Sequence, residues 1–414
     1  MRIRFLVLFL CGLGTLCHAN GGFGDEPLKL YVNPYDVDLD YLRQEITYVN
    51  HVRFPQEADV HILVTAQRTG GRGTEYTLTF VGQNRFAGIH DTLAFVANLF
   101  DTQEIVRREM VRVVKLGLMP YVKQLPVASD LVISYKASSR NGKPQEVQDK
   151  WKNWVFSIGF NTNIEGEESN RSVDLWNSLN ARRVTADWKV FFSLNNSYEE
   201  EWFDYEDAQV TSISRERAFD FSVIRSLGGH WSAGVWTGVS SSTYHNIKSR
   251  VYMEPQVEYN ILPYSESTRH ELRIVYGITA RRNVYYNETV YLKTDELLYS
   301  ESLGLHAEAV RTWGSIHSHL TGQNYLHDFQ KNSLRFSTNI SLKLVKGLSL
   351  SLWGNVSRVH DQISLPREGA TLEEVLLRQK ILRTQYYYST HIGLSYSFGS
   401  MYNNIVNPRF GGGN

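Results

Sequence analysis

Twelve ionisable side chains recur at alternate positions in the carboxy-terminal part of the chain, opposite a stripe of apolar residues. They are Arg182, Lys189, Glu254, Glu258, Arg273, Arg281, His306, Glu308, His317, His319, Arg335 and Lys343. Successive side chains of a strand point to opposite faces, so the spacing predicts one polar and one apolar face. Both signs of charge are mixed, which favours pairing that fills a narrow interior. The alternative is a selective solute path lined by these charges.

Two smaller clusters of side chains are of the types that bind metal ions. His317 and His319, with His306 and Glu308 on the neighbouring strand, have side chains that bind zinc in other proteins. The acidic residues at 199–201 and 204–207 have the oxygen ligands that Ca²⁺ prefers, although a solvated loop explains them as well. We predict no bound metal and no cofactor, because charge pairing and solvation account for both clusters.

The chain contains no recognisable nucleotide-binding or catalytic-triad motif. Asparagines at 161 and 163 and scattered serines invite comparison with outer-membrane phospholipases, but no ordered pair of His and Ser stands out. The formal net charge is zero, so no attraction to nucleic acid is implied.

The elements that carry the polar residues are predicted to be strands. After residue 151, helical periodicity gives way to alternating segments of about ten to sixteen residues, which is typical of transmembrane barrels. We expect a mainly β fold, with an antiparallel transmembrane β-barrel of about 12 strands over residues 151–400. The first strand carries Trp154, Phe156, Ile158 and Phe160 on its apolar face, and the last covers residues 386–398.

Turn lengths predict which end of the barrel faces the periplasm. The joints near 186–187, 228–230, 313–314 and 346–347 are tight, whereas 198–212 and 361–384 are longer and more polar, and 263–270 is an exception. Outer-membrane barrels have short periplasmic turns and longer outer loops. Both chain ends are therefore expected in the periplasm. A helix at 371–382 is predicted in the last outer loop, either as a lid or packed on the rim.

The amino terminus has the features of a secretory signal peptide, which we place at residues 1–19. Arg2 and Arg4 precede an apolar run, and Cys17, His18 and Ala19 form a small-x-small cleavage site. Leu16 precedes Cys17, so lipidation is not expected. The chain has two cysteines, Cys11 and Cys17, and both lie in this leader. No later stretch reaches the roughly 18 apolar residues of a membrane helix.

A small α/β periplasmic domain is predicted at residues 28–124, followed by a linker at 125–150. Strands are expected at 28–32, 59–66, 75–83 and 91–98, with helices beginning after Asp38 and Thr102. A further strand is expected at 131–135. Residues 58–64, 76–80 and 107–118 resemble the amino-terminal domain of the Tol-system propeller protein. That resemblance implies contact with a periplasmic or outer-membrane protein partner.

The last strand resembles the carboxy-terminal sorting signal of outer-membrane barrels, with His391, Gly393, Tyr396 and Phe398 at the pattern positions. It implies contact with the barrel-insertion machinery, and residues 401–414 would then be a periplasmic tail. The pattern over 151–410 resembles an uncharacterised group of bacterial outer-membrane β-barrels. This resemblance implies location in the bacterial cell outer membrane, in contact with its lipid.

The sequence thus predicts a non-enzymatic outer-membrane barrel whose periplasmic domain docks a partner, as an envelope assembly component or a narrow solute channel. The alternatives are a barrel hydrolase acting on lipid or peptide at the outer rim, and a secreted soluble β protein.

Overall fold

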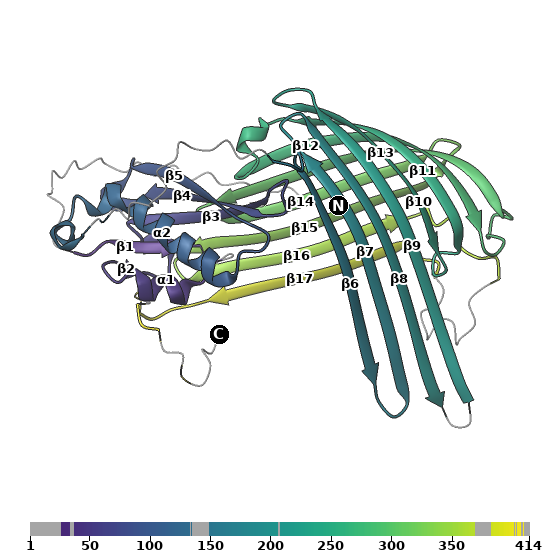
Figure 1. The fold of residues 1–414 in the computed structure, drawn as a ribbon, viewed down its shortest axis with the longest axis horizontal. Coiled ribbons are helices and arrows are strands. Elements are labelled where there is room, and N and C mark those ends of the chain that lie inside the picture. Colours follow the sequence, from purple (N-terminus) through teal and green to yellow (C-terminus); the bar gives the residue numbers. More distant parts are fainter. Residues whose placement is uncertain are drawn as a thin grey trace, which may run out of the picture.

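The computed structural model describes residues 26–33, 37–132, 134, 149–205, 208–368, 382–400, 402, 404–406 and 409. The described chain forms two sheets (Figure 1). A five-stranded sheet with two helices makes a small α/β region, and a twelve-stranded antiparallel sheet follows it. The mainly β fold class is confirmed in both parts.

The α/β region has the strand order β2-β1-β3-β4-β5, with β1 parallel to β2 and β3 and the other pairs antiparallel. Its elements are β1(Lys29–Val32), α1(Leu39–Glu45), β2(Asn50–His51), η1(Pro55–Glu57), β3(Val60–Arg68), β4(Thr74–Gly82), η2(Asn84–Phe86), β5(His90–Ala97), α2(Gln103–Val122) and η3(Pro126–Asp130). Asp38 and Thr102 cap the helices, accepting from the backbone N–H groups of Tyr41 and Ile105 at 2.9 and 3.4 Å. The predicted strand at 131–135 is wrong for its described residues, because η3 precedes them and 131, 132 and 134 are in no strand.

Helix α2 covers one face of the small sheet and closes an apolar core. Phe80, Val114 and Leu118 are fully buried there. A Cβ on Gly117 would lie 2.0 Å from Phe80 Cζ, so the glycine lets the helix approach the ring directly. This core is the ordinary arrangement of a sheet with one face covered by helices.

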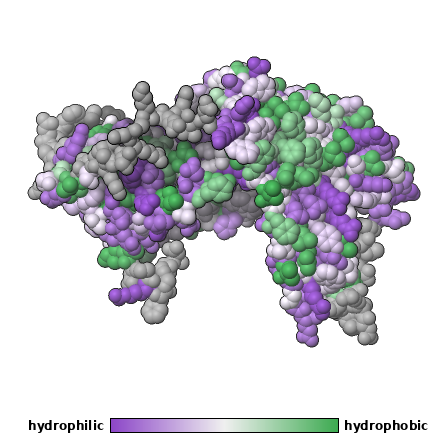
Figure 2. Space-filling view, viewed as in Figure 1, coloured by the Kyte–Doolittle hydropathy of each residue, from purple (hydrophilic) through white to green (hydrophobic). Residues whose placement is uncertain are grey.

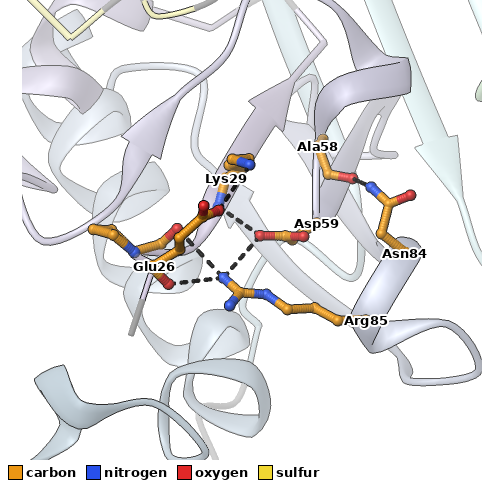
Figure 3. A network of polar contacts seen from close by, with 7 residues as sticks. Glu26, Lys29, Ala58, Asp59, Asn84 and Arg85 are labelled. Carbon is orange, nitrogen blue, oxygen red and sulfur yellow. Dashed lines mark hydrogen bonds and ion pairs between the residues drawn. The ribbon is translucent and has the colours of Figure 1, made fainter. Parts of the chain in front are cut away.

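A polar network fastens the start of β1 to η2 (Figure 3). Asp59 Oδ2 accepts from the Lys29 backbone N–H and from Arg85, both at 3.0 Å. Arg85 also donates to the carbonyl of Glu26 at 2.9 Å, and Asn84 donates to that of Ala58 at 2.8 Å. These bonds satisfy backbone groups where the chain enters the sheet.

The large sheet contains all of the predicted strands, each paired with its neighbour in sequence. They are β6(Trp154–Gly166), β7(Asn170–Val184), β8(Trp188–Tyr205), β9(Ala208–Ser226), β10(Trp231–Ser242), β11(Ile247–Asn260), β12(His270–Tyr285), β13(Asp295–Arg311), β14(Gly314–Tyr325), β15(Asp328–Val345), β16(Leu348–Val359) and β17(Tyr386–Tyr396). No helix that the structure describes is long and apolar enough to cross a membrane.

One face of the large sheet is mainly apolar from edge to edge, with Ser318, Thr338 and Thr390 as polar exceptions. The register pairs Val190 with Val223 and Phe192 with Phe221, and the same face continues to Leu352 opposite Ile392. Many of these side chains are exposed, and Ile158 is 84% accessible. Figure 2 shows apolar side chains over the body of the sheet and hydrophilic ones at the lower end of the long strands.

The sheet is open, so the predicted closure into a barrel is wrong for this structure. β6 and β17 each have one neighbour and are not paired with each other. The sheet twists so strongly that β6 to β9 run at a steep angle to β14 to β17 (Figure 1). An even strand number allows closure, but twist and the neighbouring region decide whether the edges meet.

The predicted loop at 198–212 is also wrong. β8 continues to Tyr205 and β9 starts at Ala208, which makes a long hairpin. Its outer part pairs Asn196 with Arg217 and Tyr198 with Arg215, on the face that is apolar farther down. Polar residues occur on both faces there, so the alternation that marks a strand is lost although the pairing continues. The joints after Gly166 and Tyr325 are short as well, so turn length does not separate the two ends of the sheet.

The α/β region is attached to one end of the large sheet (Figure 1). We call it the turn end, because it carries the turns after β7, β9, β13 and β15. A Cβ on Gly70 would lie 2.7 Å from Val184 Cβ, at the end of β7. Glu57 forms an ion pair with Lys346, in the turn between β15 and β16.

Beyond β17, the chain returns to the small sheet. His51 N donates to Asn404 Oδ1 at 2.6 Å, and Val52 forms an antiparallel bridge with Tyr402.

Several predictions fall outside the described residues. They are the signal peptide at 1–19, most of the linker at 125–150, nearly all of the helix at 371–382 and much of the tail at 401–414.

Candidate functional site

The strand register places all twelve predicted polar residues on the same face, opposite the apolar one. At the turn end this face is hollowed by a cavity of about 920 Å³. Six of the twelve line it: Lys189, Glu254, Glu258, Arg273, His306 and His319. Gln67 of β3 also borders it, so the α/β region forms part of its wall.

Arg273 is the centre of the polar contacts in the cavity. It lies 3.4 Å from Glu258 and 3.1 Å from Glu271. Tyr264, in the turn before β12, donates to Glu258 at 2.7 Å, and its hydroxyl lies 3.0 Å from that of Ser232. The ion pair between Arg273 and Glu258 thus joins β12 to β11. Glu271 was missed, although it has the same alternation as Arg273 and lies two residues before it.

His306 and His319 stack face to face, with ring centroids 3.8 Å apart and planes 22° apart. His319 also lies 2.6 Å from Thr321 Oγ1. In-plane nitrogens of stacked rings do not converge on one point, which a shared metal ligand set requires. Among the described residues, no group of three His, Cys, Asp or Glu side chains is placed to hold a metal ion. His317 instead lies 3.8 Å from Glu308, outside the cavity lining.

The space of the cavity comes from small residues between the large ones. Gly234 and Gly304 lie on the polar face beside Trp236 and the two stacked histidines. A Cβ on Gly304 would be 3.6 Å from His306 Nε2, so larger side chains would fill the hollow. Gln256 donates to Glu254 at 2.7 Å. The cavity therefore offers carboxylate, amide, imidazole and indole groups together.

A second polar network occupies the far end of the same face. Arg281 lies 3.4 Å from the Tyr325 hydroxyl. Arg281 is opposite Tyr252 in the register, which places it farther along the strand than Glu254. Tyr252 donates to Asp220 at 2.8 Å. Other members of this network are Arg250 with Asn283 and Tyr285 with Glu296. The alternation of β9 to β13 was the signal that could have identified them.

The remaining predicted residues lie away from both networks. Arg182 sits over the ring of Phe191 at 5.5 Å, and Arg335 lies 3.7 Å from Asp361. Lys343 is opposite Ser349 near the last tight turn. The register brings these side chains to the polar face without bringing them to the cavity.

The residues of the sorting pattern divide between the two faces of β17. Tyr396 and Phe398 are 63% and 82% exposed, and their rings stack at 5.7 Å. His391 and Gly393 alternate with them, opposite Trp353 and Ser351 on β16. This exposed aromatic pair lies at the turn end of the sheet edge.

A Ser–His hydrogen bond that the sequence did not reveal joins Ser242 Oγ to His245 Nδ1 at 3.1 Å. The two residues belong to the turn between β10 and β11, and the His245 backbone N–H also donates to Ser242 Oγ. Ser242 is only 7% exposed. The bond stabilises a local turn and leaves the hydroxyl inaccessible to a substrate.

Comparisons with known proteins give little beyond this geometry. No protein-family model matches the chain, and no curated protein matches it. A solved structure of the NanC porin is similar over 59% of this chain and 100% of the porin chain, with 8% identity and a TM-score of 0.24. At that TM-score, the similarity carries no argument. The resemblance of the α/β region to the Tol-system domain receives no support and stays a prediction.

Proposed function

We propose that the chain is a non-enzymatic outer-membrane protein whose polar face lines a narrow path for small polar solutes. The observation that carries this proposal is the division of the large sheet into two faces. A continuous apolar face with large exposed side chains suits lipid, and the opposite face is hydrogen-bonded and hollowed. A soluble protein of this size would leave a far larger apolar patch in water than is usual.

Aromatic residues at both ends of the apolar face support the membrane placement. Trp188, Trp231 and Tyr396 lie near the turn end, and Tyr388 lies toward the other end of β17. The nine residues from Tyr388 to Tyr396 span about 27 Å along the strand. That length, reduced by strand tilt, is comparable to the ~25 Å apolar band between the aromatic girdles of outer-membrane barrels.

The α/β region would cap the path at its turn end. Gln67 borders the cavity, and the Glu57–Lys346 ion pair holds the region against the β15–β16 turn. We place this region and the carboxy-terminal tail in the periplasm. Release of the cap would widen the path.

Solute uptake by proteoliposomes tests the proposal. Liposomes containing the full chain should swell slowly in small sugars and amino acids, and Lys346→Glu, which repels Glu57, should increase the rate. Lys343→Glu is the matched control, because Lys343 lies three residues away and does not line the cavity. Swelling no faster than that of protein-free liposomes, for both the native chain and Lys346→Glu, would contradict a solute path.

A second candidate function is docking of an envelope protein by the α/β region. Phe100 is 90% exposed, and Val96 and Leu99 nearby are 52% and 41% exposed. An apolar patch of this kind suits a protein partner. A photoreactive amino acid at position 100 should give a discrete adduct in intact cells, and the same probe at Lys123, which is exposed at the far end of α2, serves as a control. Equal labelling at both positions would argue against a docking patch.

We also propose that the end of β17 is read by the barrel-insertion machinery. Phe398→Lys should lower the amount of protein in the outer membrane, whereas Ser397→Lys, adjacent in sequence, should lower it less. Equal membrane levels of both variants would remove this role.

A further inference from the structure

The large sheet has two free edges, and both would lie in lipid if it crosses a membrane. β6 and β17 each present a row of backbone N–H and C=O groups with no strand beside them. Such groups cost several kcal/mol each in the hydrocarbon core, so open sheet edges are not tolerated there. Each edge therefore requires another strand.

The α/β region acts as a spacer that keeps the two edges of one chain apart. It contacts the end of β7 through Gly70 and the β15–β16 turn through Glu57. These two residues flank β3, whose nine residues span about 30 Å. If β6 paired with β17 of the same chain, the two turns would be four strand spacings apart, which is about 19 Å. The docked region is longer than that gap.

We infer that the missing neighbour is a second copy of this chain, with β6 of each copy paired to β17 of the other. This inference rests on the proposed membrane function and names the partner that completes it. Each copy contributes twelve strands, so two copies related by a two-fold axis form a closed ring of 24. The polar face of each copy is open on one side, and the partner supplies the missing wall. A ring of this size encloses a wide lumen, so the α/β region of each copy, which borders the cavity through Gln67, would keep the solute path narrow.

The two edges match in length, direction and face. β6 has 13 residues and β17 has 11, and both carry apolar side chains at even positions. Antiparallel pairing that aligns their turn ends places Ile158 opposite Ile392, and Phe156 opposite Leu394. Ser157 then faces Gly393 on the polar side. A shift of one residue would reverse every side chain, so the apolar and polar faces fix the parity of the register.

Cysteine pairs distinguish a second copy from closure within one chain. Both native cysteines, Cys11 and Cys17, lie in the predicted signal peptide, so introduced thiols should be the only ones in the exported chain. Ile158→Cys and Ile392→Cys are placed in two differently tagged copies and expressed together. Opposed Cβ atoms in such a ladder lie about 5 Å apart. Oxidation of outer membranes should give a covalent dimer that carries both tags.

Matched variants decide the outcome. Replacing Ile392→Cys by His391→Cys moves the thiol to the opposite face and should abolish the dimer band, and neither single variant should form a dimer alone. If a chain that carries both Ile158→Cys and Ile392→Cys forms the bond only within itself, the sheet closes on itself and the inference is wrong. If the protein is in the outer membrane and neither bond forms, a different partner covers the edges and the inference is also wrong. Absence from the outer membrane would instead overturn the proposed function.

Discussion

The two sheets of this protein use the same alternation of apolar and polar residues in opposite ways. In the α/β region, the apolar side chains of β3 and β4 point under α2 and are almost fully buried. In the large sheet, none of the helices that the structure describes covers the apolar face, and side chains such as Ile158 are mostly exposed. The covering layer therefore decides whether an apolar face becomes a core or an exposed surface.

The ionisable residues of the two regions also lie in different surroundings. His61 and Tyr31 of the α/β region are buried among apolar neighbours, and their rings meet edge to face with centroids 4.8 Å apart. Arg273 and its acidic partners in the large sheet face a cavity. Burial of ionisable groups is thus a cost to folding in one region and part of the candidate site in the other.

The largest expected effect comes from breaking the core of the α/β region. Phe80→Ala removes a fully buried ring and should lower the free energy of unfolding of this region by about 3 to 5 kcal/mol. Phe160→Ala, at a ring that is 71% exposed, is the control and should cost much less. Hydrogen exchange of β3 and β4, followed by mass spectrometry, measures the difference. Equal losses in the two variants would remove the distinction between the faces.

Charge on the apolar face of the large sheet should have the next largest effect. Ile340→Lys should cost about 2 to 4 kcal/mol if that face meets lipid near the bilayer centre. Asn339→Lys, one residue away on the polar face, should have little effect. The yield of folded, heat-modifiable protein in outer membranes is the measurement. Similar yields of both variants would indicate that the face meets water.

The pH dependence of stability should distinguish the buried histidine of the α/β region. Burial lowers the pKa of His61 to about 4 from 6.5, and its ring nitrogens have no hydrogen-bond partner among the described residues. The unfolded chain then binds more protons between these pH values, so stability is full above about pH 6.5 and falls toward pH 4. The loss approaches about 3 kcal/mol at pH 4.

His61→Leu removes this titration and should flatten the decline between pH 6.5 and 4. Burial also lowers the pKa of His51, so some dependence should remain in the variant. Thermal unfolding of the α/β region by hydrogen exchange at several pH values measures both slopes. An unchanged slope in His61→Leu would show that folding does not shift the pKa of His61.

The smallest expected effect is at the cavity. Arg273→Ala leaves Glu258 and Glu271 without their cation and should cost about 1 to 3 kcal/mol, since all three side chains are partly hydrated. Arg335→Ala, at a side chain that is 61% exposed, should cost less than about 1 kcal/mol. Melting temperatures in detergent compare the two. If Arg335→Ala is the more damaging variant, the cavity contacts do not stabilise the sheet.

Much of the secondary structure could be predicted from the sequence because its patterns are local. The helix caps Asp38 and Thr102 and all strands of the large sheet follow from residue types within a few positions of one another. The two-residue period of a strand is enough to place Arg273 and Glu258 on the polar face. The prediction of strands failed where that period was absent. An example is the hairpin beyond Leu194, in which polar residues occur on both faces.

The sequence by itself determined which residues share a face, since alternation along a strand is a property of the backbone. Only the tertiary structure decided how far the sheet curls, which turns the α/β region contacts, and which six of the twelve polar residues border one cavity. These features depend on accumulated twist and on contacts between residues far apart in the chain, such as Glu57 with Lys346. The pattern of residues within one strand or helix does not determine such long-range contacts.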